Sequence, residues 1–112
     1  MKPGMDDVLL DAGGGTGEGF RQIWSYFKKV VVIDLNKKAM DKVSKETPDA
    51  KAGVGDVCAI PLRDKSVDFV FSNAVIEHID RCRKTAFAKE TRRVARKGCF
   101  IPKLALECYI AM

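Results

Sequence analysis

A glycine-rich turn directly after a short apolar run constrains this chain more than any other feature. The run Val8–Leu10 precedes Asp11, and glycines stand at positions 13, 14, 15 and 17. Such a pattern is typical of a buried strand that leads into a tight loop. Glycines let the backbone approach a ligand closely, and the first amides of a following helix would face that ligand. These residues therefore predict a strand, a loop and a helix start around a binding site.

In the rest of the chain, segments with the apolar spacing of a helix alternate with short apolar runs that are typical of buried strands. Helices are expected from Gly17 to Lys28 or Lys29, from Asn36 to Thr47, and from Asp80 to Gly98. Further strands are expected at Val30–Ile33, Lys51–Asp56, Val67–Phe71 and Cys99–Ile101. Strands that alternate with helices are typical of right-handed crossovers. The sequence therefore predicts an α/β fold with an open, mostly parallel sheet and helices on both faces.

The composition fits one globular domain over residues 1–112. Hydrophobic residues make up 46% and charged residues 31%, and no stretch has the run of apolar residues that a membrane span needs. Cys58, Cys82, Cys99 and Cys108 form no C-x-x-C pair, and His78 is the only histidine, so no metal site is expected. The chain has no signal-peptide pattern, so we expect reduced cysteines and a cytoplasmic location.

The net charge of +5 does not favour a nucleic-acid partner. Much of the basic excess lies between Arg81 and Lys97 without interleaved aromatic residues, and a solvated helix face gives the same pattern.

Two further carboxylates are expected at the binding edge of the sheet. Ligands of open α/β sheets bind at the carboxyl ends of the strands, where Asp34 and Asp56 end the second and third predicted strands. A carboxylate at the position of Asp34 can accept both ribose hydroxyls. The dinucleotide pattern G-x-G-x-x-G fails because Glu18, Phe20 or Gln22 occupies its last position in each register, and no Walker lysine follows. The site therefore favours a nucleoside without phosphates.

Several segments of the sequence resemble the motifs of class I S-adenosylmethionine-dependent methyltransferases, most closely the methyltransferase type 11 group. The first motif, D-x-G-x-G-x-G, matches VLLDAGGGTGEGF, and the second matches VVVIDLN. The third and fourth match GDVCAIPLRDKSVDFVFSNAVIEHI, and the helix and strand after them match KTAFAKETRRVARKGCFI. The resemblance implies a Rossmann-like, doubly wound sheet in the strand order 3-2-1-4-5. It also implies truncation at the carboxyl end relative to the seven-stranded family fold.

The resemblance also implies S-adenosylmethionine as cofactor and assigns a role to individual residues. Residues for the methionine moiety are Asp11, the backbone at Gly13, Gly15 and Gly17, and the backbone of Asn73. Residues for the nucleoside are Asp34 for the ribose, and Leu35, Asp56 and the backbone of Val57 for the adenine. Asp64 matches a turn aspartate that we interpret as structural. His78 is the candidate catalytic base and Glu77 a weaker one, because a base is needed only where the acceptor loses a proton.

The sequence leaves three functions open. The first is a methyltransferase that acts on a small-molecule acceptor. The second is an S-adenosylmethionine-binding module or regulatory subunit without activity of its own. The third, a nicotinamide-dependent oxidoreductase, is disfavoured by Glu18. A homodimer is expected through an uncovered sheet edge or the apolar carboxyl-terminal tail.

Overall fold

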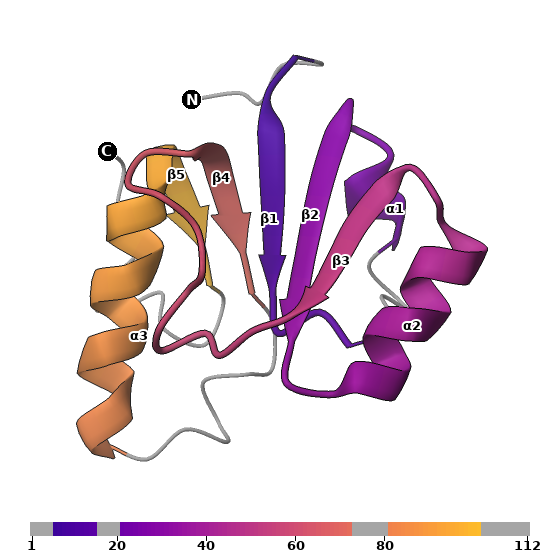
Figure 1. Cartoon of the computed structure of the whole chain (residues 1–112). Helices are drawn as coiled ribbons and strands as arrows, with labels where there is room; N and C mark the ends of the chain where they lie inside the picture. Colours follow the sequence, from indigo (N-terminus) through magenta and orange to yellow (C-terminus); the bar gives the residue numbers. More distant parts are fainter. Residues whose placement is uncertain (1–5, 16–20, 73–80, 102–112) are drawn as a thin grey trace.

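Five parallel strands form one sheet in the order β3-β2-β1-β4-β5 (Figure 1). The structure is a computed structural model that describes residues 6–15, 21–72 and 81–101. The strands are β1 (Val8–Ala12), β2 (Lys29–Asp34), β3 (Ala50–Val54), β4 (Val67–Phe71) and β5 (Ala95–Phe100). The helices are α1 (Arg21–Trp24), α2 (Lys37–Glu46) and α3 (Arg81–Val94). The predicted fold class and strand order are confirmed. No helix within the described ranges is long and apolar enough to cross a membrane.

Both faces of the sheet are buried, which explains the uninterrupted apolar runs of the central strands. Successive side chains of a strand point to opposite faces. Val32 of β2 therefore packs in a cluster with Met40 and Val43 of α2. The next residue, Ile33, packs in a second cluster with Phe87 of α3. The sheet is thus doubly wound, and all five strands end at the same edge (Figure 1).

The second helix has the ends that the sequence predicts. Asn36 is the N-cap of α2, and its side-chain oxygen accepts a hydrogen bond from the amide of Ala39 at 3.1 Å. Thr47 is the C-cap, and Pro48 follows it.

The first helix ends earlier than its apolar pattern indicates. The prediction of a helix as far as Lys28 is wrong, because α1 ends at Trp24 and three successive amides, from Ser25 to Phe27, bond to carbonyls three residues earlier. This tighter turn brings the ring of Phe27 edge-on to Phe69 of β4, with the ring centroids 6.2 Å apart. Packing against the sheet therefore overrides the helical period here.

The third helix also ends earlier, and the fifth strand follows it without a connecting loop. The predictions of a helix as far as Gly98 and of a strand from Cys99 are wrong, because β5 already begins at Ala95. Ala95 pairs with Val67 of β4, and Gly98 pairs with Phe69 inside the strand. Sheet pairing therefore decides the backbone conformation of these residues, and Gly98 is no helix stop.

The end of β3 and one buried polar residue of α3 also have physical explanations. β3 spans Ala50–Val54 and ends before Asp56, because Asp56 forms a separate antiparallel bridge with Ala59. Thr91 is a polar residue of α3, and it is buried. Its hydroxyl donates to the carbonyl of Ala88 at 2.9 Å, which satisfies the buried polar atom.

Candidate ligand-binding site at the carboxyl ends of the strands

Asp34 joins the end of β2 to the glycine loop. One of its carboxylate oxygens accepts a hydrogen bond from the amide of Gly15, and the other accepts one from the amide of Asn36, both at 2.9 Å. The amide of Gly13 donates to the carbonyl of Ile33 at 2.8 Å, which fixes the start of the loop beside the same strand. The side chain of Asp34 is therefore held at the edge of the sheet, where sequence analysis expects the ribose.

The loop conformation requires glycine at particular positions. Gly13 and Gly15 have positive φ angles of 76° and 55°, which side chains rarely adopt. Gly14 is required for a different reason, because a Cβ atom there would lie 2.8 Å from the carboxyl carbon of Asp11. The loop thus lies directly on the carboxylate of Asp11.

A Gly14→Ala substitution is expected to weaken ligand binding at this edge about tenfold or more and to destabilise the fold by about 1–3 kcal/mol. The methyl group would overlap a short, buried side chain that has no room to move, and overpacking of this kind costs such an amount. Calorimetric titration and urea unfolding measure the two effects. Gly53→Ala in β3 is the matched control, since a Cβ there meets no atom within 4 Å. Equal behaviour of the two variants would contradict the expected clash.

Asp11 is buried below the loop and bonded to the only tryptophan of the chain. Its side chain accepts a hydrogen bond from the indole N–H of Trp24 at 2.8 Å, and the residue is 2% exposed. Burial raises the pKa of Asp11 from its usual value of 3.8 to about 6, while the Trp24 hydrogen bond opposes the shift and Asp34 adds to it. Trp24 lies within the helix predicted from Gly17, where its spacing with Ile23 and Phe27 indicates only an apolar helix face. The missed signal is its indole N–H, which needs an acceptor when buried.

Asp56 is held by two donors at the same edge. Its carboxylate accepts a hydrogen bond from the amide of Cys58 at 2.8 Å and another from the guanidinium of Arg83 in α3. The bond from the Cys58 amide is the main reason that the pKa of Asp56 is lowered. Val57 is buried beside it, and Leu35 after β2 is 66% exposed. The basic residues between Arg81 and Lys97 are expected on a solvated helix face, so the sequence does not predict this contact of Arg83.

Four expected site residues lie outside the described residues. These are Gly17, Asn73, Glu77 and His78.

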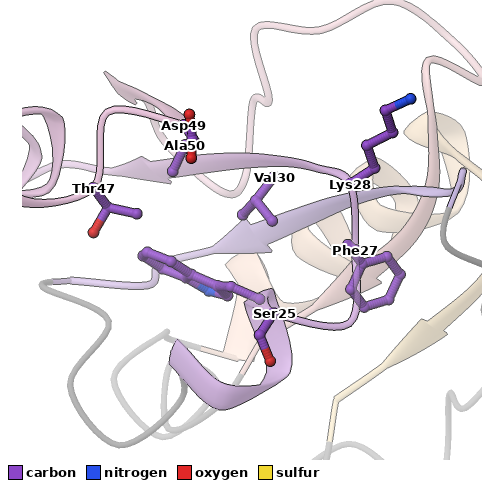
Figure 2. A pocket seen from close by; sticks show the side chains of 8 residues that line it. Ser25, Phe27, Lys28, Val30, Thr47, Asp49 and Ala50 are labelled. Carbon is purple, nitrogen blue, oxygen red and sulfur yellow. The ribbon is translucent and has the colours of Figure 1, made fainter.

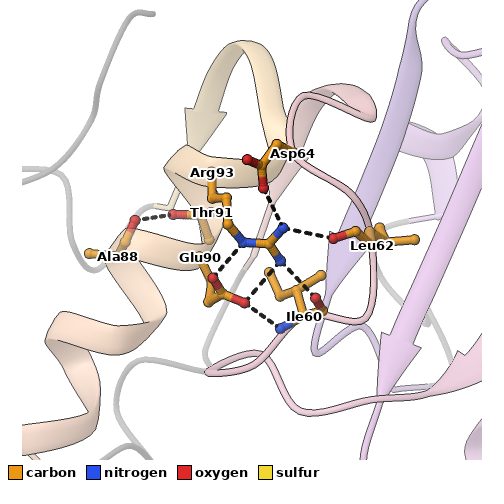
Figure 3. A network of polar contacts seen from close by, with 7 residues as sticks. All are labelled: Ile60, Leu62, Asp64, Ala88, Glu90, Thr91 and Arg93. Atoms are coloured by element: carbon orange, nitrogen blue, oxygen red, sulfur yellow. Dashed lines mark hydrogen bonds and ion pairs between the residues drawn. The ribbon is translucent and has the colours of Figure 1, made fainter.

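The loop that carries Asp56 and Val57 is fixed to α3 by a network around Arg93 (Figure 3). The guanidinium donates to the carbonyls of Ile60 and Leu62, each at 2.8 Å, and to Asp64 at 2.9 Å. Glu90 accepts from the same guanidinium and from the amide of Ile60. The turn role expected of Asp64 thus has a geometric basis, because its carboxylate binds the side chain that ties the loop to the helix.

A pocket of about 400 Å³ lies away from these carboxylates. Val30 and Ala50, near the amino ends of β2 and β3, form part of its wall, and the side chains of Phe27, Thr47 and Asp49 also line it (Figure 2). Asp34 and Asp56 lie beyond its lining, toward the opposite ends of the strands. Trp24, which donates a hydrogen bond to Asp11, also lines this pocket, but none of the three carboxylates of the candidate site does.

The chain belongs to a methyltransferase family. A family model described as methyltransferase domain matches residues 10–101. A malonyl-[acyl-carrier protein] O-methyltransferase from Yersinia pestis is 38% identical over 84% of this chain and 34% of its own length. A probable S-adenosylmethionine-dependent methyltransferase from Mycobacterium tuberculosis is 34% identical over 79% of this chain and 31% of its own length. The chain thus spans about a third of the length of these relatives.

Solved structures share the fold at lower identity. An S-adenosylmethionine-dependent methyltransferase from Methanosarcina mazei superposes with a TM-score of 0.79 at 23% identity, covering 88% of this chain and 53% of that one. Phosphoethanolamine N-methyltransferase 1 from Haemonchus contortus, in complex with phosphoethanolamine and S-adenosylhomocysteine, superposes with a TM-score of 0.77 at 19% identity. That match covers 90% of this chain and 22% of the other. The Rossmann-like methyltransferase fold is thereby confirmed.

Proposed function

We propose that the chain binds S-adenosylmethionine at the carboxyl ends of β1, β2 and β3 and takes part in methyl transfer to a small-molecule acceptor. The methyl group on the positive sulfur of this donor is already activated for in-line displacement. The task of the chain's own residues is therefore to hold and orient the donor.

The observation that carries this proposal is the position and bonding of Asp34. Each of its two carboxylate oxygens accepts one backbone amide hydrogen bond and keeps a lone pair for a second. The carboxylate can therefore accept both ribose hydroxyls while it stays fixed beside the glycine loop. Exposed Leu35 next to it offers an apolar surface for the adenine, and Asp56 and Val57 stand on the neighbouring loop.

An Asp34→Ala substitution is expected to weaken the affinity for S-adenosylmethionine by about 5- to 150-fold. The loss of two hydrogen bonds to the ribose should cost about 1–3 kcal/mol of binding free energy. Calorimetric titration with S-adenosylmethionine, S-adenosylhomocysteine and NAD measures this loss. Asp49→Ala is the matched control, because Asp49 is an exposed carboxylate at the amino end of β3. Unchanged affinity in Asp34→Ala would show that the ribose binds elsewhere, and binding of NAD alone would favour an oxidoreductase.

The same proposal includes a base and an assembly. His78 would take a proton from an acceptor that must lose one. The edge strands β3 and β5 each pair on one side only in the described sheet, which supports a homodimer through an edge. A binding module without activity differs from the enzyme in one measurable respect, since it binds the donor and turns over no acceptor.

A further inference from the structure

The Trp24–Asp11 pair lies beneath the glycine loop, and the proposed function gives Trp24 no role. The indole of Trp24, 5% exposed, lies below Asp11 on the face of the sheet that α1 and α2 cover. The backbone of Gly14 lies directly against the same carboxylate. The carboxylate is thus held between an indole N–H and the glycine loop, and it has little access to solvent.

We propose that Trp24 is a positioning residue of the donor site. Its indole N–H holds the Asp11 carboxylate beneath the glycine loop, where this carboxylate is a buried negative charge for the cationic donor. The inference rests on the proposed function, because the donor carries a permanent positive charge on its sulfur. Trp24 acts through Asp11, to which it donates its single polar hydrogen.

The surroundings of Asp11 make its charge responsive to pH. Among the described residues, the charged group that raises its pKa is Asp34 at the end of β2, while Trp24 of α1 lowers it and burial has the largest effect. The other side chains of the cluster around Trp24, on β1, β2, β3, β4 and α2, are apolar. A cationic donor binds more tightly to the ionised carboxylate, so its affinity should rise with pH through the pKa of Asp11, near 6.

The wild-type chain itself allows a first test, because Trp24 is its only tryptophan. Its fluorescence should change with pH with a midpoint near 6, and the change should disappear in Asp11→Asn. S-adenosylmethionine should move this midpoint to lower pH, because it favours the ionised form. A transition that persists in Asp11→Asn, or a midpoint that bound donor leaves unmoved, would overturn the inference.

The second test is the Trp24→Phe variant, which keeps an aromatic ring and removes the indole N–H. Loss of this hydrogen bond should raise the midpoint of the affinity–pH profile by about one pH unit. Affinity for S-adenosylmethionine should therefore fall about fivefold at pH 6 and stay almost unchanged at pH 8. Phe27→Leu is the matched control, since it removes aromatic packing from the same segment without touching Asp11.

A double-mutant cycle separates positioning from simple packing. If Trp24 acts through Asp11, adding Trp24→Phe to Asp11→Asn should not weaken donor binding further. A purely structural role would instead lower affinity equally at every pH and in both backgrounds, which would overturn the inference but leave the proposed function intact. A folded wild-type chain that binds neither S-adenosylmethionine nor S-adenosylhomocysteine would overturn the proposed function itself, whereas the fluorescence titration would still report the Trp24–Asp11 pair.

Discussion

Replacing Asp11 by Asn is expected to raise the free energy of unfolding at about pH 7.5 by about 3 kcal/mol, since a shift of two pKa units is worth about that much. The folded-state pKa of Asp11 lies near 6 and its unfolded value near 3.8. Between these values the folded state binds more protons, so the contribution of Asp11 to stability falls as pH rises from about 4 to about 6. Above this pH window the ionised carboxylate lowers the free energy of unfolding by its full amount. Below the window, wild type and Asp11→Asn should have the same free energy of unfolding.

Urea unfolding at several pH values measures this difference. The carboxylates of Asp56 and Glu90 have lowered pKa values, so they contribute stability that is lost as pH falls. They are present in both proteins, and subtraction cancels their effect. Asp41→Asn, at an exposed carboxylate on α2, is the control for the loss of one negative charge. A gap between wild type and Asp11→Asn that is the same at all pH values would contradict the assigned burial of the charge.

Replacing Arg93 by Met is expected to lower the free energy of unfolding by about 3 kcal/mol. The guanidinium donates to Glu90, Asp64 and two loop carbonyls, and hydrogen bonds to charged groups contribute about 1.5–3 kcal/mol each. Partial exposure of the network reduces the sum, because water can replace some of the lost donors. Met keeps the aliphatic packing, so the loss reports the polar contacts.

Arg92→Met on the exposed side of the same helix turn is the matched control, and it should change stability by less than about 0.5 kcal/mol. Arg93→Lys should recover only part of the loss, because one ammonium group cannot reach acceptors on both sides of a planar guanidinium. Thermal or urea unfolding measures all three variants. Equal losses in Arg92→Met and Arg93→Met would mean that charge on α3 matters and the network does not.

Local sequence patterns predict the features that repeat along the chain. Apolar periods indicate five strands and their alternation with helices, and the glycine positions indicate the loop that the structure shows beside Asp34. Contacts between polar side chains far apart in the chain could not be predicted in this way. Trp24 and Asp11 are 13 residues apart, and Arg83 and Asp56 are 27 apart, so neither pair leaves a pattern in a short window. The ends of α1 and α3 are missed because sheet packing, which a local period does not report, decides them.

The direct passage from α3 into β5 leaves no flexible linker between the helix and the outer strand. Connections between a helix and the next strand commonly contain two to six residues, and here Val94 is followed at once by Ala95. Arg93, in the last turn of that helix, holds the loop that carries Asp56. The outer strand, the helix and the loop that carries Asp56 are therefore connected without an intervening flexible segment. A displacement of β5 would therefore also move the loop that carries Asp56, because no flexible linker separates the strand from the helix.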